Sequence, residues 1–137
     1  MARSLIPPLV VVGLCLACAA AHSKQRTLAP EGTRVITAEQ IEASGARTVW
    51  DALRRTVTTY TFRESGRIDH RGRSSIVLSE PPHVLLDGVV LGDVRVLDRM
   101  PASDVLTIEV LSGITGTTYH GTNGTNGVIR IRTRQGG

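Results

Sequence analysis

Apolar residues in the first part of the folded region recur at helical spacing. Thr37 and Gln40 stand three positions apart in the pattern of a capping box, which predicts a two-turn helix over 38–44. A second helix, capped by Thr48 and running through Arg55, is expected because its apolar residues fall on one face at spacings of one, four and eight. The pattern therefore predicts two short helices, each with one apolar face.

Other apolar residues stand in short runs or alternate with polar residues, as they do in strands. The segments with this pattern are 34–36, 58–62, 75–78, 107–111 and 128–133. Asp87-Gly88 separates the apolar runs 84–86 and 89–91. An Asp-Gly pair between two apolar runs predicts a β-hairpin.

Turn-forming residues mark the remaining segments. Residues 63–74 contain four arginines and two glycines, and a loop is expected there. Residues 101–105 fit one helical turn with Pro at its start. Residues 112–127 are rich in glycine and hold two Asn-Gly pairs, which predict an irregular stretch of turns.

The order of these segments predicts an α+β domain over residues 34–134. It consists of a small mixed β-sheet with two or three short helices on one side. The core is expected to be aliphatic, because the chain has one Trp, two Tyr and one Phe. The expected core residues are Val35, Ile36, Ile41, Val49, Leu53, Val84, Leu86, Ile108, Val110, Ile129 and Ile131.

The N-terminus carries the pattern of an export signal. In residues 1–18 a positive charge precedes a mostly apolar stretch that is shorter than the about 20 apolar residues of a membrane span. A Leu-Ala-Cys sequence ending at Cys18 resembles a bacterial lipobox and would make Cys18 the lipidated first residue, whereas the alanines 19–21 allow cleavage before His22. Lipidation is preferred, because a cysteine at this site is otherwise unexplained. Residues 19–33 have the composition of a flexible linker.

Charge and cysteine content narrow the range of partners. The net charge is +4, but the arginines are scattered and few aromatic residues could stack on bases, so nucleic acid is not an expected partner. Both cysteines lie in the N-terminal segment. The folded region therefore has no cysteine for a disulfide, a nucleophile or a zinc site.

Five motifs follow one another in a recognisable order and spacing. They are 35–45 with 49–55, Arg71-Gly72, 84–89, 101–104 with 108–111, and a closing set of Tyr119, Gly121 and 127–131. Together they resemble the plug domain of TonB-dependent outer-membrane receptors, and the similarity runs from about residue 34 to 134. The sequence departs from the family at Ser112, where the family usually has Arg before the glycine.

The resemblance implies the plug fold, with loops that in receptors are apical and touch substrate. Such receptors surround the plug with a barrel of 22 strands, which at about 10 residues per strand needs several hundred residues. A chain of 137 residues is too short to hold that barrel as well. A stand-alone plug-like module without its own pore is therefore expected.

Candidate contact residues lie in the hairpin and the glycine-rich stretch, because loops on a rigid scaffold commonly carry recognition. They are Asp87, Gly88, Tyr119, Gly121, Asn123 and Gly124. The four histidines share no metal-ligand spacing, and no nucleophile motif is present. No enzyme activity, cofactor or metal is expected.

The function expected from these observations is non-catalytic. The chain is interpreted as an exported plug-like module at the outer membrane that binds an envelope protein or a small ligand and is linked to nutrient uptake. It would be an outer-membrane lipoprotein facing the periplasm, held by a lipid anchor at Cys18, or a soluble periplasmic protein if cleaved before His22. The alternative is a structural or adaptor lipoprotein of the envelope that adds a strand to a partner sheet.

Overall fold

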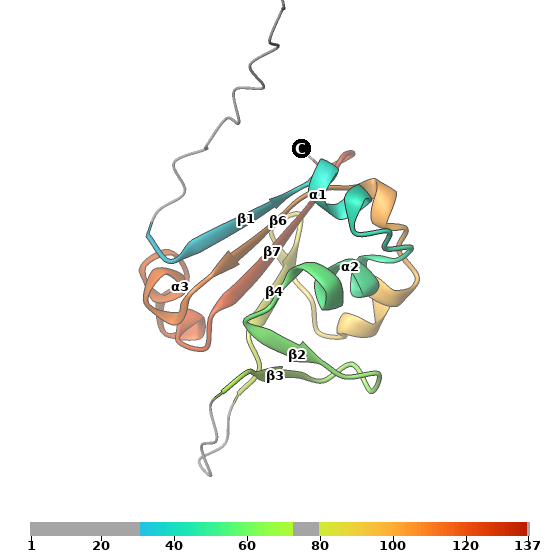
Figure 1. The fold of residues 1–137 in the computed structure, drawn as a ribbon. Coiled ribbons are helices and arrows are strands. Elements are labelled where there is room, and N and C mark those ends of the chain that lie inside the picture. The colour runs from blue at the N-terminus through green and yellow to red at the C-terminus, as the bar shows by residue number, and fades with distance from the viewer. Residues whose placement is uncertain (1–30, 73–79, 137) are drawn as a thin grey trace, which may run out of the picture.

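Five strands form a mixed β-sheet at the centre of the fold (Figure 1). The computed structural model describes residues 31–72 and 80–136. β4 and β7 run parallel, and the other neighbouring strands of this sheet are antiparallel. The predicted mixed sheet, with the hairpin strand beside the final strand, is confirmed. In sheet order the strands are β1 (Thr33–Thr37), β6 (Val105–Leu111), β7 (Val128–Thr133), β4 (His83–Leu86) and β5 (Val89–Val90).

Two short helices, α1 (Ala38–Ala43) and α2 (Val49–Thr56), lie over one face of the sheet (Figure 1). Gln40 reaches back from the first turn of α1, and its Oε1 accepts a hydrogen bond from the backbone N–H of Thr37 at 3.1 Å. Thr48 caps α2 by accepting a hydrogen bond from the Asp51 N–H at 3.2 Å. Both helices begin where the sequence predicts, because their caps are local features.

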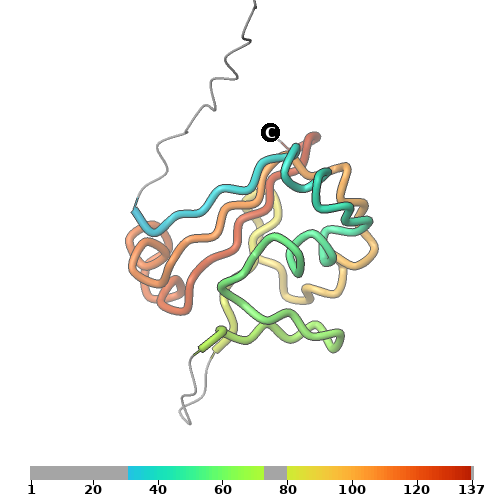
Figure 2. Tube along the Cα trace, in the orientation of Figure 1, coloured from blue at the N-terminus to red at the C-terminus, as the bar shows by residue number. Residues whose placement is uncertain are grey.

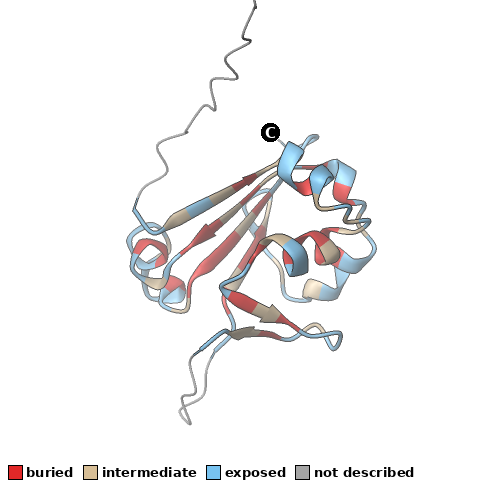
Figure 3. Ribbon diagram, in the orientation of Figure 1, coloured by how far each residue is buried: buried red, intermediate tan, exposed pale blue. Residues whose placement is uncertain are grey.

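The main core fills the space between this face of the sheet and the two helices (Figure 3). Nine of the eleven expected core residues are buried there. Val35 is only half-buried: it faces Glu109 across the β1–β6 pair, on the opposite face of the sheet from its neighbour Ile36. The prediction that Val35 is a core residue is therefore wrong, since adjacent strand residues point to opposite faces. Leu86 is partly buried and packs against the edge of the core.

A second, two-stranded sheet pairs β2 (Tyr60–Phe62) with β3 (Ile68–His70). β3 corrects the expected loop over 63–74. Ile68 is 3% exposed and pairs with Phe62, so its burial holds this segment against the core as a strand. The strand expected at 75–78 lies outside the described residues.

The glycine-rich stretch is helical, which corrects the expectation of irregular turns. It forms α3 (Gly113–His120) followed by the 3-10 turn η3 (Gly121–Gly124). Figure 2 shows this stretch coiling at one end of the central sheet. Gly116 approaches Val128, whose side chain lies on the sheet face opposite to Ile129, so α3 does not share a side with α1 and α2.

Two further 3-10 turns, η1 (Val94–Asp98) and η2 (Ala102–Asp104), connect β5 to β6. The helical turn predicted over 101–105 is confirmed by η2. Within the described ranges no helix has the length and apolar character required to cross a membrane.

Candidate binding surfaces at the two ends of the sheet

The two predicted contact loops lie at opposite ends of the central sheet. In the parallel β4–β7 pair, His83 faces Val128 and Leu86 faces Ile131. The hairpin turn follows Leu86, whereas α3 and η3 precede Val128. The length of β7 therefore separates Asp87 from the α3–η3 segment, and the two loops do not form one surface.

The Asp87-Gly88 turn has the backbone of a hairpin, and its carboxylate is engaged with the last strand. Asp87 and Gly88 have φ angles of 47° and 86°, the positive values that a type I′ turn requires. The Asp87 carboxylate accepts hydrogen bonds from the Thr133 N–H at 2.7 Å and from the Thr133 hydroxyl at 2.8 Å. These bonds join the hairpin to the end of β7, so the Asp87 carboxylate stabilises the fold whether or not it also contacts a partner.

The predicted contact residues of the α3–η3 segment differ in exposure. Tyr119 is 59% exposed, and Gly121 and Asn123 are exposed as well. Gly124 is buried, and a side chain on the facing Gly116 would have its Cβ 2.5 Å from the Gly124 carbonyl oxygen. The structure therefore places Gly124 in a close helix–turn packing contact rather than on a surface.

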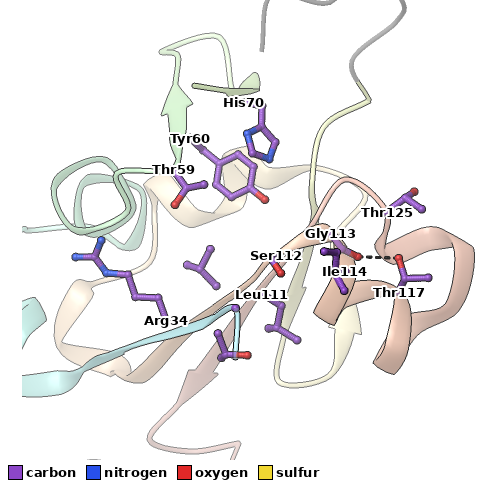
Figure 4. A pocket seen from close by; sticks show the side chains of 13 residues that line it. Arg34, Thr59, Tyr60, His70, Leu111, Ser112, Gly113, Ile114, Thr117 and Thr125 are labelled. Carbon is purple, nitrogen blue, oxygen red and sulfur yellow. Dashed lines mark hydrogen bonds between the residues drawn. The ribbon is translucent and has the colours of Figure 1, made fainter. Parts of the chain in front are cut away.

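A cleft of about 630 Å³ opens between α3 and the β2–β3 ribbon (Figure 4). It lies where β1 starts and β6 ends. Five separate segments contribute its walls, two of them from the β2–β3 ribbon. They supply Gly32, Thr33 and Arg34; Thr59, Tyr60 and His70; Val110 and Leu111 with Ser112, Gly113, Ile114 and Thr117; and Thr125.

The ribbon side of the cleft is aromatic. Tyr60 is 2% exposed, and its hydroxyl donates a hydrogen bond to the Asn126 carbonyl oxygen at 3.1 Å, which ties β2 to the segment before β7. The His70 ring lies against Tyr60 with 4.6 Å between ring centroids. In Figure 4 both rings project toward the opening from above. This side is held in place by contacts between distant segments.

The α3 side of the cleft is fixed by hydroxyl groups. Ser112 caps the helix by accepting from the Thr115 N–H at 3.4 Å, and the Thr115 hydroxyl donates to the Glu31 carbonyl oxygen at 2.8 Å. The second bond fastens α3 to the chain just before β1. Ile114 extends from this helix into solvent with 87% of its surface exposed, and Leu111 beside it is buried.

The described lining of this cleft holds basic side chains and no acidic one. Arg34 and His70 are basic, and none of the thirteen lining residues is an aspartate or glutamate. Arg34 donates from Nη1 to the Thr58 hydroxyl at 3.0 Å, and within the described ranges it forms no ion pair. Thr33 Oγ1 is buried and has no hydrogen-bond partner among the described residues.

The sequence did not point to this cleft. Arg34, Thr59 and His70 stand in three segments whose pairing only the fold decides, and no local motif joins them. Asn123, which the sequence did single out, lines a different hollow of about 870 Å³ together with His83 and Val90.

Three carboxylates on the elements around the core have lowered pKa values. In Asp69 on β3, hydrogen bonds from Arg63 Nε at 2.6 Å and Arg67 Nε at 2.7 Å lower the pKa, and Arg63 has the larger effect. In Asp51 on α2, the hydrogen bond from Arg55 lowers the pKa most. In Glu39, a hydrogen bond from the Thr37 side chain lowers the pKa. In each case the largest cause is a side-chain hydrogen bond from a neighbouring residue, as is found in ordinary surface contacts.

Among residues 31–72 and 80–136, no group of three or more His, Cys, Asp or Glu side chains is arranged to hold a metal ion. The three described histidines stand on three different elements. His83 starts β4, His70 ends β3 and His120 ends α3.

The mixed sheet, the two covering helices and the Asp87-Gly88 hairpin define a plug-domain-like fold, and comparison with known proteins identifies the family. The TonB-dependent receptor plug domain family matches residues 26–128. This match covers most of the chain, which therefore belongs to the TonB-dependent receptor plug domain family.

Individual relatives agree with this assignment. The chain is 31% identical over 108 residues to the rhizobactin receptor of Rhizobium meliloti, covering 74% of this chain and 14% of that protein. It is 33% identical over 66 residues to TonB-dependent receptor P26 of Formosa agariphila, covering 48% of this chain and 7% of that protein. The siderophore receptor PirA of Pseudomonas aeruginosa is similar in structure, with a TM-score of 0.54 and 28% identity over 77% of this chain and 19% of that chain. The chain thus spans less than a fifth of the length of each of these relatives.

Proposed function

We propose that this chain is a non-catalytic plug module that works at the outer membrane in the uptake of a nutrient. The observation that carries the proposal is the family match over residues 26–128 together with a complete mixed sheet in the described residues. The rhizobactin receptor and PirA are named as receptors, so a role in ligand uptake follows the family. The proposed module binds a small ligand or an envelope protein through its exposed loops.

The proposed location depends on the N-terminal segment. Residues 1–18 serve as an export signal, residues 19–33 as a linker, and Cys18 as the lipid-anchored first residue of the mature protein. Mass spectrometry of the mature N-terminus tests this proposal. A diacylated or triacylated peptide beginning at Cys18 is expected, and a Cys18→Ser variant should leave the membrane fraction. An unmodified peptide beginning at His22 would instead make the protein soluble in the periplasm.

Site-directed photo-crosslinking in cells tests whether the α3 end of the module contacts a partner. A photoreactive residue replaces Tyr119, which is 59% exposed, and the matched control carries it at Arg54, which is exposed on α2. The expected result is a discrete crosslinked outer-membrane protein from position 119 and none from position 54. Equal crosslinking from both positions, or none in the membrane fraction, would count against the proposed module.

One observation favours the alternative of an adaptor that adds a strand to a partner. β5 is an edge strand, and its two residues Val89 and Val90 are 67% and 57% exposed. Lysine on an edge strand blocks pairing with another chain. If the protein is an adaptor, the double variant Val89→Lys, Val90→Lys loses its envelope partner. If it is a plug module acting through α3, the same variant keeps the crosslink from position 119.

A further inference from the structure

We propose that the cleft between α3 and the β2–β3 ribbon binds a small organic anion that carries an apolar or aromatic body. This inference deepens the proposed function by naming a class of ligand and a place for it. A volume of about 630 Å³ lies within the range of about 300–1,000 Å³ that is usual for small-molecule sites.

The charge of the lining selects an anion. Arg34 has no carboxylate partner among the described residues, and the only other basic side chain in the lining is His70. Among the thirteen described lining residues, no acidic side chain is present to repel an anion or to pair with the guanidinium. One Arg34 nitrogen is used by the Thr58 hydroxyl, which orients the group and leaves further N–H donors for a carboxylate.

The rest of the lining suits an apolar body. Val110 and Leu111 line the end of β6, and Ile114 stands beside them with 87% of its surface in solvent. Tyr60 and His70 form an aromatic side opposite α3, as Figure 4 shows. A flat apolar ligand would cover part of Ile114 and contact the rings, and removal of that surface from water favours binding.

The hollow near the hairpin has a different character. Its lining includes both acidic and basic side chains, Glu80 and Asp93 with Arg67 and Arg95. It therefore shows no preference for an anion, and the inference is confined to the cleft beside α3.

The test measures binding of three naphthalene compounds of equal size to the purified chain by NMR. The probes are 2-naphthoate, its neutral amide and the 2-naphthylmethylammonium cation. We expect saturable shifts with 2-naphthoate at the amides of Gly32, Gly113 and Thr117, weaker shifts with the amide, and none with the cation. Equal shifts with all three probes, shifts that map elsewhere, or no saturation with 2-naphthoate up to about 1 mM would overturn the proposal.

Single substitutions test whether the binding of 2-naphthoate takes place in this cleft. Arg34→Gln should weaken 2-naphthoate binding about tenfold, the loss expected for one charge-assisted hydrogen bond, and should remove the preference over the amide. Arg34→Lys keeps the positive charge and should retain the preference for 2-naphthoate over the amide. It therefore shows whether a loss in Arg34→Gln comes from the missing charge or from a change at this position that disturbs the fold. Arg47→Gln removes an exposed arginine from the connection between α1 and α2, outside the cleft lining, and should bind as the unmodified chain.

A reduced affinity for both the acid and the amide is expected from Ile114→Ser, because this change removes apolar contact without removing charge. Unchanged binding in Arg34→Gln or in Ile114→Ser would overturn the proposal. These measurements use the isolated chain, so a negative result leaves the crosslinking test of the outer-membrane role unaffected.

Discussion

Asp87 gives the sharpest test of how the hairpin is joined to the last strand. Its carboxylate accepts two hydrogen bonds from Thr133, at 2.7 and 2.8 Å, and its backbone has a φ of 47°. Asp87→Ala removes both acceptors and places alanine in a left-handed conformation. Hydrogen bonds to a charged group contribute about 1.5–3 kcal/mol when well shielded, and about 1 kcal/mol each is a fair value for this exposed turn. The left-handed conformation costs alanine about 1 kcal/mol more.

The expected loss for Asp87→Ala is therefore about 3 kcal/mol of unfolding free energy. Asp87→Asn should lose only about 1 kcal/mol, because asparagine tolerates a positive φ and keeps one oxygen acceptor. Asp98→Ala is the matched control: it removes the same charge from an exposed aspartate for which the described residues show no hydrogen bond or ion pair. Its effect should stay within about 0.5 kcal/mol.

Urea unfolding followed by circular dichroism measures these differences from the transition midpoints at constant slope. The reasoning fails if Asp87→Ala is as stable as Asp98→Ala, since the two hydrogen bonds would then contribute nothing. It also fails if Asp87→Asn lowers stability as much as Asp87→Ala does. Asparagine keeps one oxygen acceptor and tolerates the positive φ, so equal losses would mean that neither property matters at this position.

Three further predictions address the ribbon, the α3–η3 contact and the core. The hydrogen bonds from two arginines lower the folded-state pKa of Asp69. Its carboxylate should therefore stabilise the fold above the ordinary aspartate pKa, and this stabilisation should vanish as pH falls through the lowered pKa. The urea midpoints of the unmodified chain and of Asp69→Asn should differ at about pH 7 and converge at about pH 2. A constant difference across that range would contradict this account. Gly124→Ala should cost about 1–3 kcal/mol because its Cβ would overlap the α3 backbone, whereas Gly92→Ala, with open space around it, should be nearly neutral in the same unfolding assay. Leu53→Ala should cost about 2–5 kcal/mol because Leu53 is fully buried, and Leu106→Ala, at a site 42% exposed, should cost far less; comparable losses in thermal unfolding would refute the core assignment.

Features that depend on neighbouring residues could be predicted from the sequence. The start of α1 follows from Thr37 and Gln40, and the hairpin follows from Asp87-Gly88, because capping and turn formation involve contacts only a few residues apart. The alternation of apolar and polar residues in β6 and β7 fixed which side chains enter the core, since the side-chain period of a strand is two.

Errors arose where packing overrode a local tendency. Glycine and Asn-Gly pairs favour turns, yet residues 113–120 form a helix because small residues at Gly116 and Gly124 allow two backbones to approach closely. Arginine-rich residues 63–74 were expected to be a loop, but Ile68 is buried against the core and draws in a strand. In both segments the deciding contact is with a residue far along the chain or in another element.

The sequence by itself determined the family, the α+β class, the caps and most of the core, because each rests on local spacing or on motifs in order. The tertiary structure alone decided that the hairpin and α3 occupy opposite ends of the sheet. It also decided that Arg34, Tyr60, His70 and Ile114 surround one cleft. Such groupings depend on strand order and register, which are set by the summed burial of the whole core and are not encoded at any single position.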